Sequence, residues 1–193
     1  MQSNVQPTIQ DDFITETING QEVLMSPRPA TPHNRVASNI HGIFWQFLRK
    51  KRCETFFEPD VFLDEANNFV PDVAIICDKD KIKHNGIHGA PDLVVEVLSP
   101  STITNDRGVK KDAYERAGVK EYWIVDPTAK SIEVYYLREG RFVLDHAYIV
   151  FPEEEWERMT EKDRAKTRLT VKVSLYDDLI VDVREVFDAK DEA

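Results

Sequence analysis

The chain has 193 residues, of which 41% are hydrophobic and 10% aromatic, enough to fill the core of one ordinary domain. Its net charge of -10 argues against non-specific nucleic-acid binding through overall positive charge, because affinity for phosphates comes from Lys and Arg. No run approaches about 18 consecutive apolar residues, and the first residues lack the basic and apolar regions of a secretory signal. We therefore expect a cytoplasmic protein without membrane contact.

Charge is distributed unevenly along the chain. Residues 25–52 carry six Lys and Arg and no acid, whereas residues 53–75 carry six acids and no base. The remaining acidic excess lies in the first 24 residues and after residue 144, so the acidic surplus is largely peripheral. A basic face is therefore compatible with the acidic total.

A helix is the first element that the sequence predicts. The prolines of residues 27–32 favour a rigid linker, and apolar residues at helical spacing predict a helix over residues 34–51. The basic run RKKR at residues 49–52 suits the C-terminus of this helix, where cations are favoured. A solvated helix end is the preferred interpretation of that run over a contact with DNA.

Three strand-like runs follow, at residues 56–63, 69–77 and 92–99. Residues 65–68 have turn composition, which predicts a hairpin between the first two runs. The last two runs are apolar on both alternating faces, a pattern typical of central strands covered on both sides. The polar segment 79–91 between them is predicted to be a mobile loop.

A second helix is predicted from about residue 106 to residue 117, with Asn105 as its N-cap and Gly118 as its left-handed C-terminal residue. The apolar run EYWIVDP at residues 121–127 then predicts another buried strand.

The C-terminal part predicts a β-hairpin that turns at Glu139 and Gly140. The charged residues 152–168 indicate an exposed helix or loop, and LIVDVREVF at residues 179–187 should pack back on the core. We expect a single α/β (α+β) domain over residues 1–193, with one central mixed sheet flanked by helices and an added C-terminal hairpin. Its core would span about residues 25–150, with an N-terminal extension over residues 1–24 and a C-terminal extension over residues 151–193.

The two cysteines, Cys53 and Cys77, form no CxxC motif. We expect two reduced thiols in the core, and neither a disulfide nor a zinc site.

A carboxylate interrupts each of the two predicted central strands. Glu96 shares its strand face with the apolar Val94 and Leu98, and Asp72 shares its face with Ala74. A buried carboxylate must be protonated, paired, hydrogen-bonded or bound to a cation. If the strands are neighbours, the two acids repel each other unless positive charge lies between them, and Mg²⁺ typically takes one or two protein carboxylates.

The helix after the second acid supplies a candidate cation. Asp106, Lys110 and Tyr114 follow one another at a spacing of four, which places them on one helix face. Two acids, a metal and a lysine suit phosphodiester hydrolysis, because the metal activates water and the lysine adds positive charge near the phosphate.

The runs VPDVAII, APDLVVEVLSPST and DRGVKKDAYERAGVKEYWIVDP resemble the Uma-two family of nucleases, a restriction-endonuclease-like branch of the PD-(D/E)xK superfamily. The similarity covers about residues 25–150, and the closing LIVDVREVF also resembles the family's C-terminus. The resemblance implies a restriction-endonuclease-like fold and an endonuclease that acts on DNA with Mg²⁺ or Mn²⁺. A homodimer would suit cleavage of both strands of a duplex.

The resemblance also assigns site residues. Asp72 matches the first acid of the motif and Glu96 the second, and these two with the Val97 backbone carbonyl would hold the metal. The lysine of the wider superfamily should stand two residues after the glutamate, where this chain has Leu98. In the Uma-two family the matching lysine comes from the following helix, which makes Lys110 the third catalytic residue.

Supporting roles are expected for three further side chains. His33 resembles the family's histidine at the head of the first helix, and Asp106 and Tyr114 could support the site. The superfamily often adds an acid from the first helix, but residues 33–52 contain none.

Structural interpretations stand beside these functional ones. Asp72 could bond to loop amides, Glu96 could form a buried salt bridge with Lys110 or Lys111, and Lys110 could be a solvated helix lysine. Asp106 is favoured by the helix dipole at the start of its helix. The whole chain could then be a non-catalytic module that binds nucleic acid or protein and retains the nuclease fold.

Overall fold

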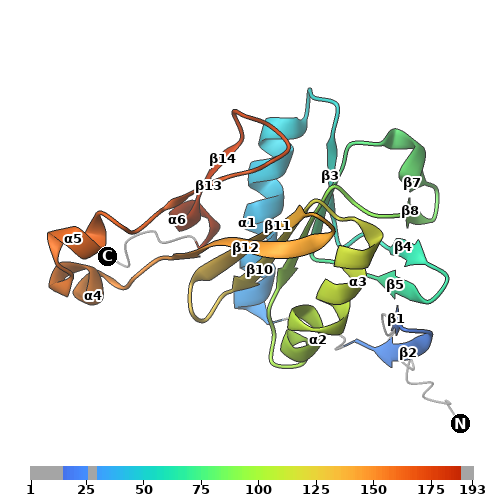
Figure 1. Cartoon of the computed structure of the whole chain (residues 1–193), viewed down its shortest axis with the longest axis horizontal. Helices are drawn as coiled ribbons and strands as arrows, with labels where there is room; N and C mark the ends of the chain where they lie inside the picture. The colour runs from blue at the N-terminus through green and yellow to red at the C-terminus, as the bar shows by residue number, and fades with distance from the viewer. Residues whose placement is uncertain (1–14, 26–29, 188–193) are drawn as a thin grey trace, which may run out of the picture.

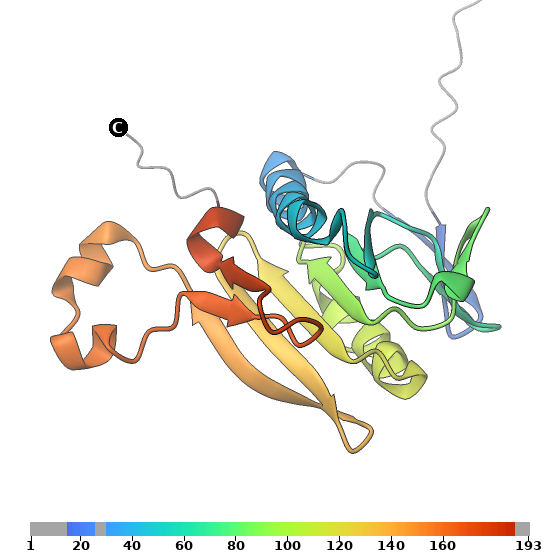
Figure 2. The ribbon, with the colours of Figure 1, turned by 90° about the horizontal axis from the view of Figure 1, so that it is seen from above.

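The centre of the fold is a six-stranded mixed sheet with the strand order β12-β11-β10-β9-β6-β3 (Figures 1 and 2). The computed structural model of the chain describes residues 15–25 and 30–187. In the central sheet β9 and β10 are parallel, and the other neighbours are antiparallel. Its strands are β3 (Glu54–Phe57), β6 (Val73–Ile76), β9 (Leu93–Val97), β10 (Glu121–Asp126), β11 (Ser131–Arg138) and β12 (Arg141–Ile149).

Two smaller sheets accompany the central one. A second six-stranded sheet has the order β2-β1-β5-β4-β8-β7, and a two-stranded sheet pairs β13 with β14 near the C-terminus. Their strands are β1 (Thr15–Ile18), β2 (Gln21–Leu24), β4 (Val61–Asp64), β5 (Asn67–Phe69), β7 (Ile82–Lys83), β8 (Gly86–His88), β13 (Thr170–Lys172) and β14 (Ile180–Asp182).

The helices are α1 (Thr31–Leu48), α2 (Ile103–Arg107), α3 (Val109–Ala117), α4 (Glu153–Arg158), α5 (Glu161–Arg164) and α6 (Val183–Val186), with one 3-10 turn, η1 (Lys79–Lys81). Helices α1 and α6 pack on one face of the central sheet and α3 on the other, whereas α4 and α5 extend beyond its end (Figures 1 and 2). Helix α1 confirms the predicted first helix but begins earlier, because Pro32 is tolerated in a first turn, where its missing N–H has no partner to lose. Among the described residues, none of the helices combines the length and apolar character needed to cross a bilayer.

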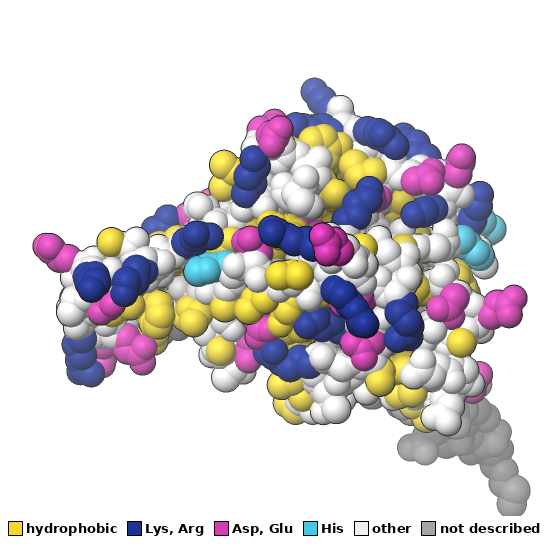
Figure 3. Space-filling model, viewed as in Figure 1, with side chains coloured by type: hydrophobic (Ala, Val, Ile, Leu, Met, Phe, Trp, Pro, Cys, Tyr) yellow, Lys and Arg dark blue, Asp and Glu magenta, His cyan; other side chains and the backbone are white. Residues whose placement is uncertain are grey.

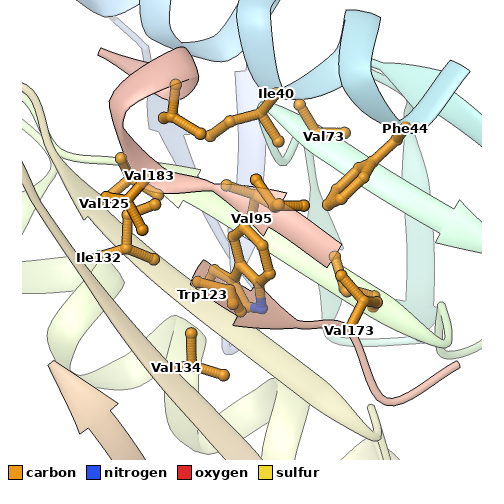
Figure 4. Close-up of a cluster of buried hydrophobic side chains, with 14 of the residues drawn as sticks. Ile40, Phe44, Val73, Val95, Trp123, Val125, Ile132, Val134, Val173 and Val183 are labelled. Carbon is orange, nitrogen blue, oxygen red and sulfur yellow. The ribbon is translucent and has the colours of Figure 1, made fainter. Parts of the chain in front are cut away.

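Each face of the central sheet buries its own hydrophobic cluster. On one face Trp123 of β10 packs edge-on against Phe44 of α1, with Val95 of β9 beside them, and α6 and β14 close the same cluster (Figure 4). The other face packs Tyr122 against Tyr114 of α3, beneath the second sheet. The two clusters confirm the predicted α+β fold with a central mixed sheet covered on both sides.

Two of the predicted strands are broken in the structure. The run 56–63 is divided between β3 of the central sheet and β4 of the second sheet, because Glu58 adopts a positive φ of 46° and Pro59 follows it. The run 69–77 is likewise divided into β5 and β6 at Pro71, which has no N–H to offer a ladder. The predicted hairpin is therefore only the short β4–β5 pair.

The prediction of a mobile loop at residues 79–91 is wrong. The segment contains η1 and the antiparallel pair β7–β8, and β8 continues the second sheet by pairing with β4. Gly86 makes this pairing feasible, because it has a φ of 133° and a Cβ there would come within 2.6 Å of the Asp60 carbonyl oxygen.

The second predicted helix consists of two helices, α2 and α3, which meet at Gly108. Asn105 lies inside α2, so its predicted role as an N-cap is wrong. Gly118 ends α3 with a φ of 87°, as predicted. The hairpin β11–β12 turns at Glu139 and Gly140, and the C-terminal run packs on the core through β14 and α6, so both of these predictions are confirmed.

The prediction of two free thiols is wrong, because Cys53 and Cys77 form a disulfide. The β3–β6 ladder pairs Glu54 with Ile76, and one step further along it places the two cysteines opposite each other. This relation depends on strand register between residues 24 positions apart, which no local motif reveals.

The disulfide should contribute to stability by constraining the unfolded chain. For a loop of this length, chain entropy predicts a contribution of about 3 kcal/mol. Urea unfolding of the oxidised protein, repeated in dithiothreitol, should show a loss of this size, and a Cys53→Ala/Cys77→Ala variant should show no response to the reductant. Equal stability of the wild-type protein in both conditions would contradict the bridge.

Candidate active site

Asp72 and Glu96 lie side by side on neighbouring strands. The antiparallel β6–β9 ladder pairs Val73 with Val95, and one step further it places Asp72 opposite Glu96. Directly opposite residues share a sheet face, with Cβ atoms about 4.5–5.5 Å apart. Asp72 is 9% exposed and Glu96 is 3% exposed. The structure therefore brings the two predicted acids together in a nearly dry environment.

Lys110 of α3 points into the same place. Its Nζ lies 2.8 Å from Glu96 Oε1, 3.0 Å from Glu16 Oε1 and 3.5 Å from Asp106 Oδ1. The Tyr114 hydroxyl donates a hydrogen bond to the same Glu96 Oε1 at 3.0 Å. Because Lys110 is only 2% exposed, the interpretation as a solvated helix lysine is wrong. The predicted contact between the helix and the strand acid is present as a buried ion-pair network.

The junction of α2 and α3 keeps these side chains on one face. Asp106 lies in the last turn of α2 and Lys110 in the first turn of α3, with Gly108 between them. A Cβ at Gly108 would come within 2.9 Å of a backbone oxygen of the preceding turn, so a larger residue would disturb this junction. The Tyr122 hydroxyl of β10 donates to the Asp106 carbonyl at 2.8 Å, which fixes α2 to the sheet.

Asp72 is held from two sides. The Val97 N–H donates to Asp72 Oδ2 at 2.6 Å, and His33 Nε2 lies 3.3 Å from Asp72 Oδ1. His33 is in the first turn of α1, so the head of this helix reaches the site as the sequence predicted. Its Nδ1 is buried and has no hydrogen-bond partner among the described residues. A further donor or acceptor could therefore still bind there.

Glu16 is the site residue that sequence reasoning missed. It lies on β1, in a segment that we assigned to an N-terminal extension, and its Oε1 accepts from both Lys110 Nζ and the Val70 N–H at 3.0 and 2.9 Å. The signal that could have found it is the pair Asn19-Gly20, which is typical of a hairpin turn and here joins β1 to β2. Glu16 thus brings an acid to Lys110 from outside the predicted core.

Burial dominates the electrostatics of the site. It raises the pKa of Asp72 to about 6, against the lowering effects of His33 and the Val97 N–H. Burial also raises the pKa of Glu96 well above its usual range, against the attraction of Lys110. For Lys110 burial acts downward, but the charges of Glu96, Glu16 and Asp106 outweigh it, so its pKa is raised. The site thus favours a charged lysine, while burial opposes ionisation of Asp72 and Glu96.

The donor set fits a hard divalent cation. Three carboxyl groups, those of Glu16, Glu96 and Asp106, lie within 3.5 Å of the Lys110 ammonium group, and Asp72 stands beside Glu96. Mg²⁺ takes oxygen ligands, typically one or two carboxylates, and keeps several waters. Within residues 15–25 and 30–187, no three His, Cys, Asp or Glu side chains form a metal-binding group. The adjacent pair Asp72 and Glu96 therefore fits Mg²⁺ with water ligands better than a zinc cage.

Comparison with known proteins identifies the family of the chain. A family model described as "Uma2: Putative restriction endonuclease" matches residues 4–166. The chain belongs to the Uma2 (Uma-two) family. The resemblance inferred from the motifs is thereby confirmed, and membership of this family supports a nuclease-like function.

Two further proteins are similar to this member of the Uma2 family. The uncharacterized protein slr1290 of Synechocystis sp. is 39% identical over 108 residues, which cover 54% of this chain and 56% of the relative. A crystal structure from Anabaena variabilis, described as a "putative nuclease belonging to DUF820", superposes with a TM-score of 0.67 at 18% identity. That match covers 90% of this chain and 89% of the other, and it confirms the restriction-endonuclease-like fold.

Replacement of Glu16 by alanine should destabilise the protein by about 3 kcal/mol, because it removes one acceptor from a buried ammonium group. Urea unfolding measures this loss. Glu22→Ala is the matched control, since Glu22 is an exposed acid on the same hairpin, and it should stay within about 0.5 kcal/mol of the wild type. Equal stabilities of the two variants would show that Glu16 does not support Lys110.

Asp72 should make the metal-free protein less stable as the pH rises. Its pKa is about 6 in the folded state and 3.8 ordinarily, so folding favours its protonated form. This contribution is fully present below about pH 4 and is lost as the pH rises through 6, amounting to roughly 3 kcal/mol at most. Urea unfolding in EDTA from pH 4 to 7 should show this loss relative to Asp72→Asn. Parallel pH profiles of the two proteins would contradict the raised pKa.

Proposed function

We propose that this member of the Uma2 family is a metal-dependent endonuclease that hydrolyses DNA phosphodiester bonds. One observation carries the proposal: Asp72, immediately before β6, stands opposite Glu96 of β9, and the Lys110 ammonium lies 2.8 Å from Glu96. Two acids and a lysine in a water-poor site match the requirements of phosphodiester hydrolysis. Family membership supports the same chemistry.

In this proposal Asp72, Glu96 and the Val97 backbone carbonyl would hold Mg²⁺ or Mn²⁺. When bound, the ion would lower the pKa of a water molecule and neutralise charge that develops on the phosphate. The raised pKa of Asp72 and of Glu96 supports this assignment, because a cation relieves the cost of ionising buried carboxyl groups.

The remaining groups position the reacting atoms. Lys110 would orient the attacking water and place positive charge beside the phosphate, while Glu16 and Asp106 hold its ammonium group. Tyr114 fixes Glu96 by its hydrogen bond, and burial raises the pKa of this tyrosine, so its hydroxyl stays a neutral donor. His33 fixes Asp72 from the side of α1.

DNA as the substrate and a homodimer as the active form are parts of the same proposal. Two copies related by a two-fold axis would present one site to each strand of a duplex.

A non-catalytic module is the second candidate, and one observation favours it. Lys110 is already paired with three carboxylates, and the network that it forms is almost inaccessible to solvent. Such a network could serve stability alone, as buried ion pairs do in proteins without catalysis.

The nuclease proposal predicts that the protein converts supercoiled plasmid to open-circular and linear forms with Mg²⁺ or Mn²⁺. Glu96→Gln and Lys110→Ala should reduce the rate by at least about 100-fold, a typical loss when a group that stabilises the transition state is removed. Lys111→Ala is the matched control on the same helix and should cleave at the wild-type rate. Equal cleavage by all variants would indicate a contaminating nuclease and contradict the proposal.

Calorimetric titration with Mg²⁺ and Mn²⁺ separates the enzyme from the module. The enzyme requires a binding signal that is lost in Asp72→Ala and retained in Lys111→Ala. Absence of any signal from the folded wild-type protein would favour the module.

A further inference from the structure

The outward face of α1 carries a stripe that the candidate active site does not use. Arg35, Ser38, Gly42, Trp45 and Arg49 follow one another at alternating spacings of three and four, which aligns them along one side of the helix, and all five are exposed. Figure 2 looks down α1 and shows the sheet and α6 on one side of the helix, with its other side turned outward.

Two aromatic side chains on or beside this face are exposed to solvent. Trp45 is 53% exposed, and the Arg49 guanidinium lies 5.2 Å from the centre of its ring. On the neighbouring strand β3, Phe57 is 38% exposed and meets the His41 ring edge-on, with 5.7 Å between ring centres. Exposed aromatic rings beside arginine are typical of binding surfaces.

Helix α1 contributes only positive charge to this face. Helix α1 contains no acid, and residues 25–52 contain six Lys and Arg in a chain of net charge -10. The side chains of Arg35, Arg49 and Lys50 are exposed. Glu54, an acid on the adjoining strand, has its carboxylate 3.3 Å from Lys79 Nζ, which offsets its charge. The face therefore complements a ligand with repeated negative charges.

The centre of the stripe admits a backbone at close range. Ser38 and Gly42 are small, and a Cβ at Gly42 would meet no described atom within 4 Å. Arg35 and Arg49 are separated by four helical turns, about 21 Å along the axis. That length spans several phosphates of an extended strand, with Trp45 between the two arginines.

We propose that this face of α1 binds single-stranded nucleic acid, with a base stacked on Trp45 and phosphates on Arg35 and Arg49. Stacking on an exposed aromatic ring combined with a cationic track is how proteins hold unpaired strands without reading their sequence. The inference rests on the proposed nuclease function and names the strand that the site would receive. The first turn of the same helix carries His33, which contacts Asp72, so the stripe and the candidate active site share this helix, although His33 is buried on its inner side.

Fluorescence anisotropy with a labelled oligo(dT) of about 20 nucleotides tests this binding in EDTA, where metal-dependent cleavage cannot occur. We expect Trp45→Ala to weaken binding by about 5-fold to 100-fold, and Trp45→Phe to retain most of it because a stacking ring remains. Arg35→Gln and Arg49→Gln should each lower the slope of log affinity against log salt by about 0.7. Leu144→Ala and Arg158→Gln are controls for an exposed apolar and an exposed basic residue elsewhere, and they should bind as the wild type does.

Several outcomes would overturn the inference. Absence of binding by the wild-type protein in EDTA would do so even if plasmid cleavage persists, and the nuclease proposal would then stand alone. Equal binding by Trp45→Ala and the wild type would show that the ring takes no base. A change of oligomeric state in Trp45→Ala, measured by light scattering, would assign the face to a contact between copies of the chain. Conversely, loss of binding in Trp45→Ala alongside absent cleavage by every protein would support the strand-binding face and contradict the nuclease.

Discussion

The Lys110 ammonium group is the point on which the candidate site depends. It joins Glu96 of β9 and Asp106 of α2 to Glu16 of β1, which is far from both in the sequence. Breaking such a pair by removing one partner typically costs several kcal/mol, because the remaining charge stays buried. Lys110 therefore adds a polar link between the second sheet, the central sheet and the α2–α3 pair, beside the hydrophobic cluster that these elements share.

The site contains more carboxyl groups than positively charged groups, and this excess affects their pKa values. One ammonium group cannot neutralise four carboxyl groups, so burial and mutual repulsion keep the pKa values of Asp72, Glu96 and Asp106 high. A divalent cation between Asp72 and Glu96 would favour their ionised forms, as the proposed nuclease requires. The same fold would then separate two tasks: the proposed chemistry lies on the face of the sheet under the second sheet, and the proposed strand-binding face lies on α1 at the opposite side. Figure 3 shows Lys and Arg mixed with Asp and Glu over the front of the molecule. Helix α1 itself contains no acid.

Local patterns predicted those parts of the site that depend on neighbouring residues. Strand alternation placed Glu96 on a buried face, and a spacing of four placed Lys110 beside Tyr114, because both rules concern residues close in the sequence. Glu16 escaped prediction because its contact with Lys110 spans 94 positions and depends on how the second sheet docks. The Cys53–Cys77 disulfide was not predicted for a related reason: the register of β3 against β6 places the two cysteines opposite each other. The two strands that break at Pro59 and Pro71 show a third limit of sequence-based prediction. Each hydrophobic run looks like one strand, but the chain passes from one sheet to the other within it.

A crystal of the protein soaked in Mn²⁺ tests the central claim most directly, because the anomalous scattering of the ion locates it independently of activity. The account predicts one anomalous peak between the carboxylates of Asp72 and Glu96, within coordination distance of both, and no peak there in crystals of Glu96→Gln. Wild-type crystals without a peak at this position, with Lys110 still bridging Glu16 and Glu96, would contradict it and indicate a network built for stability alone.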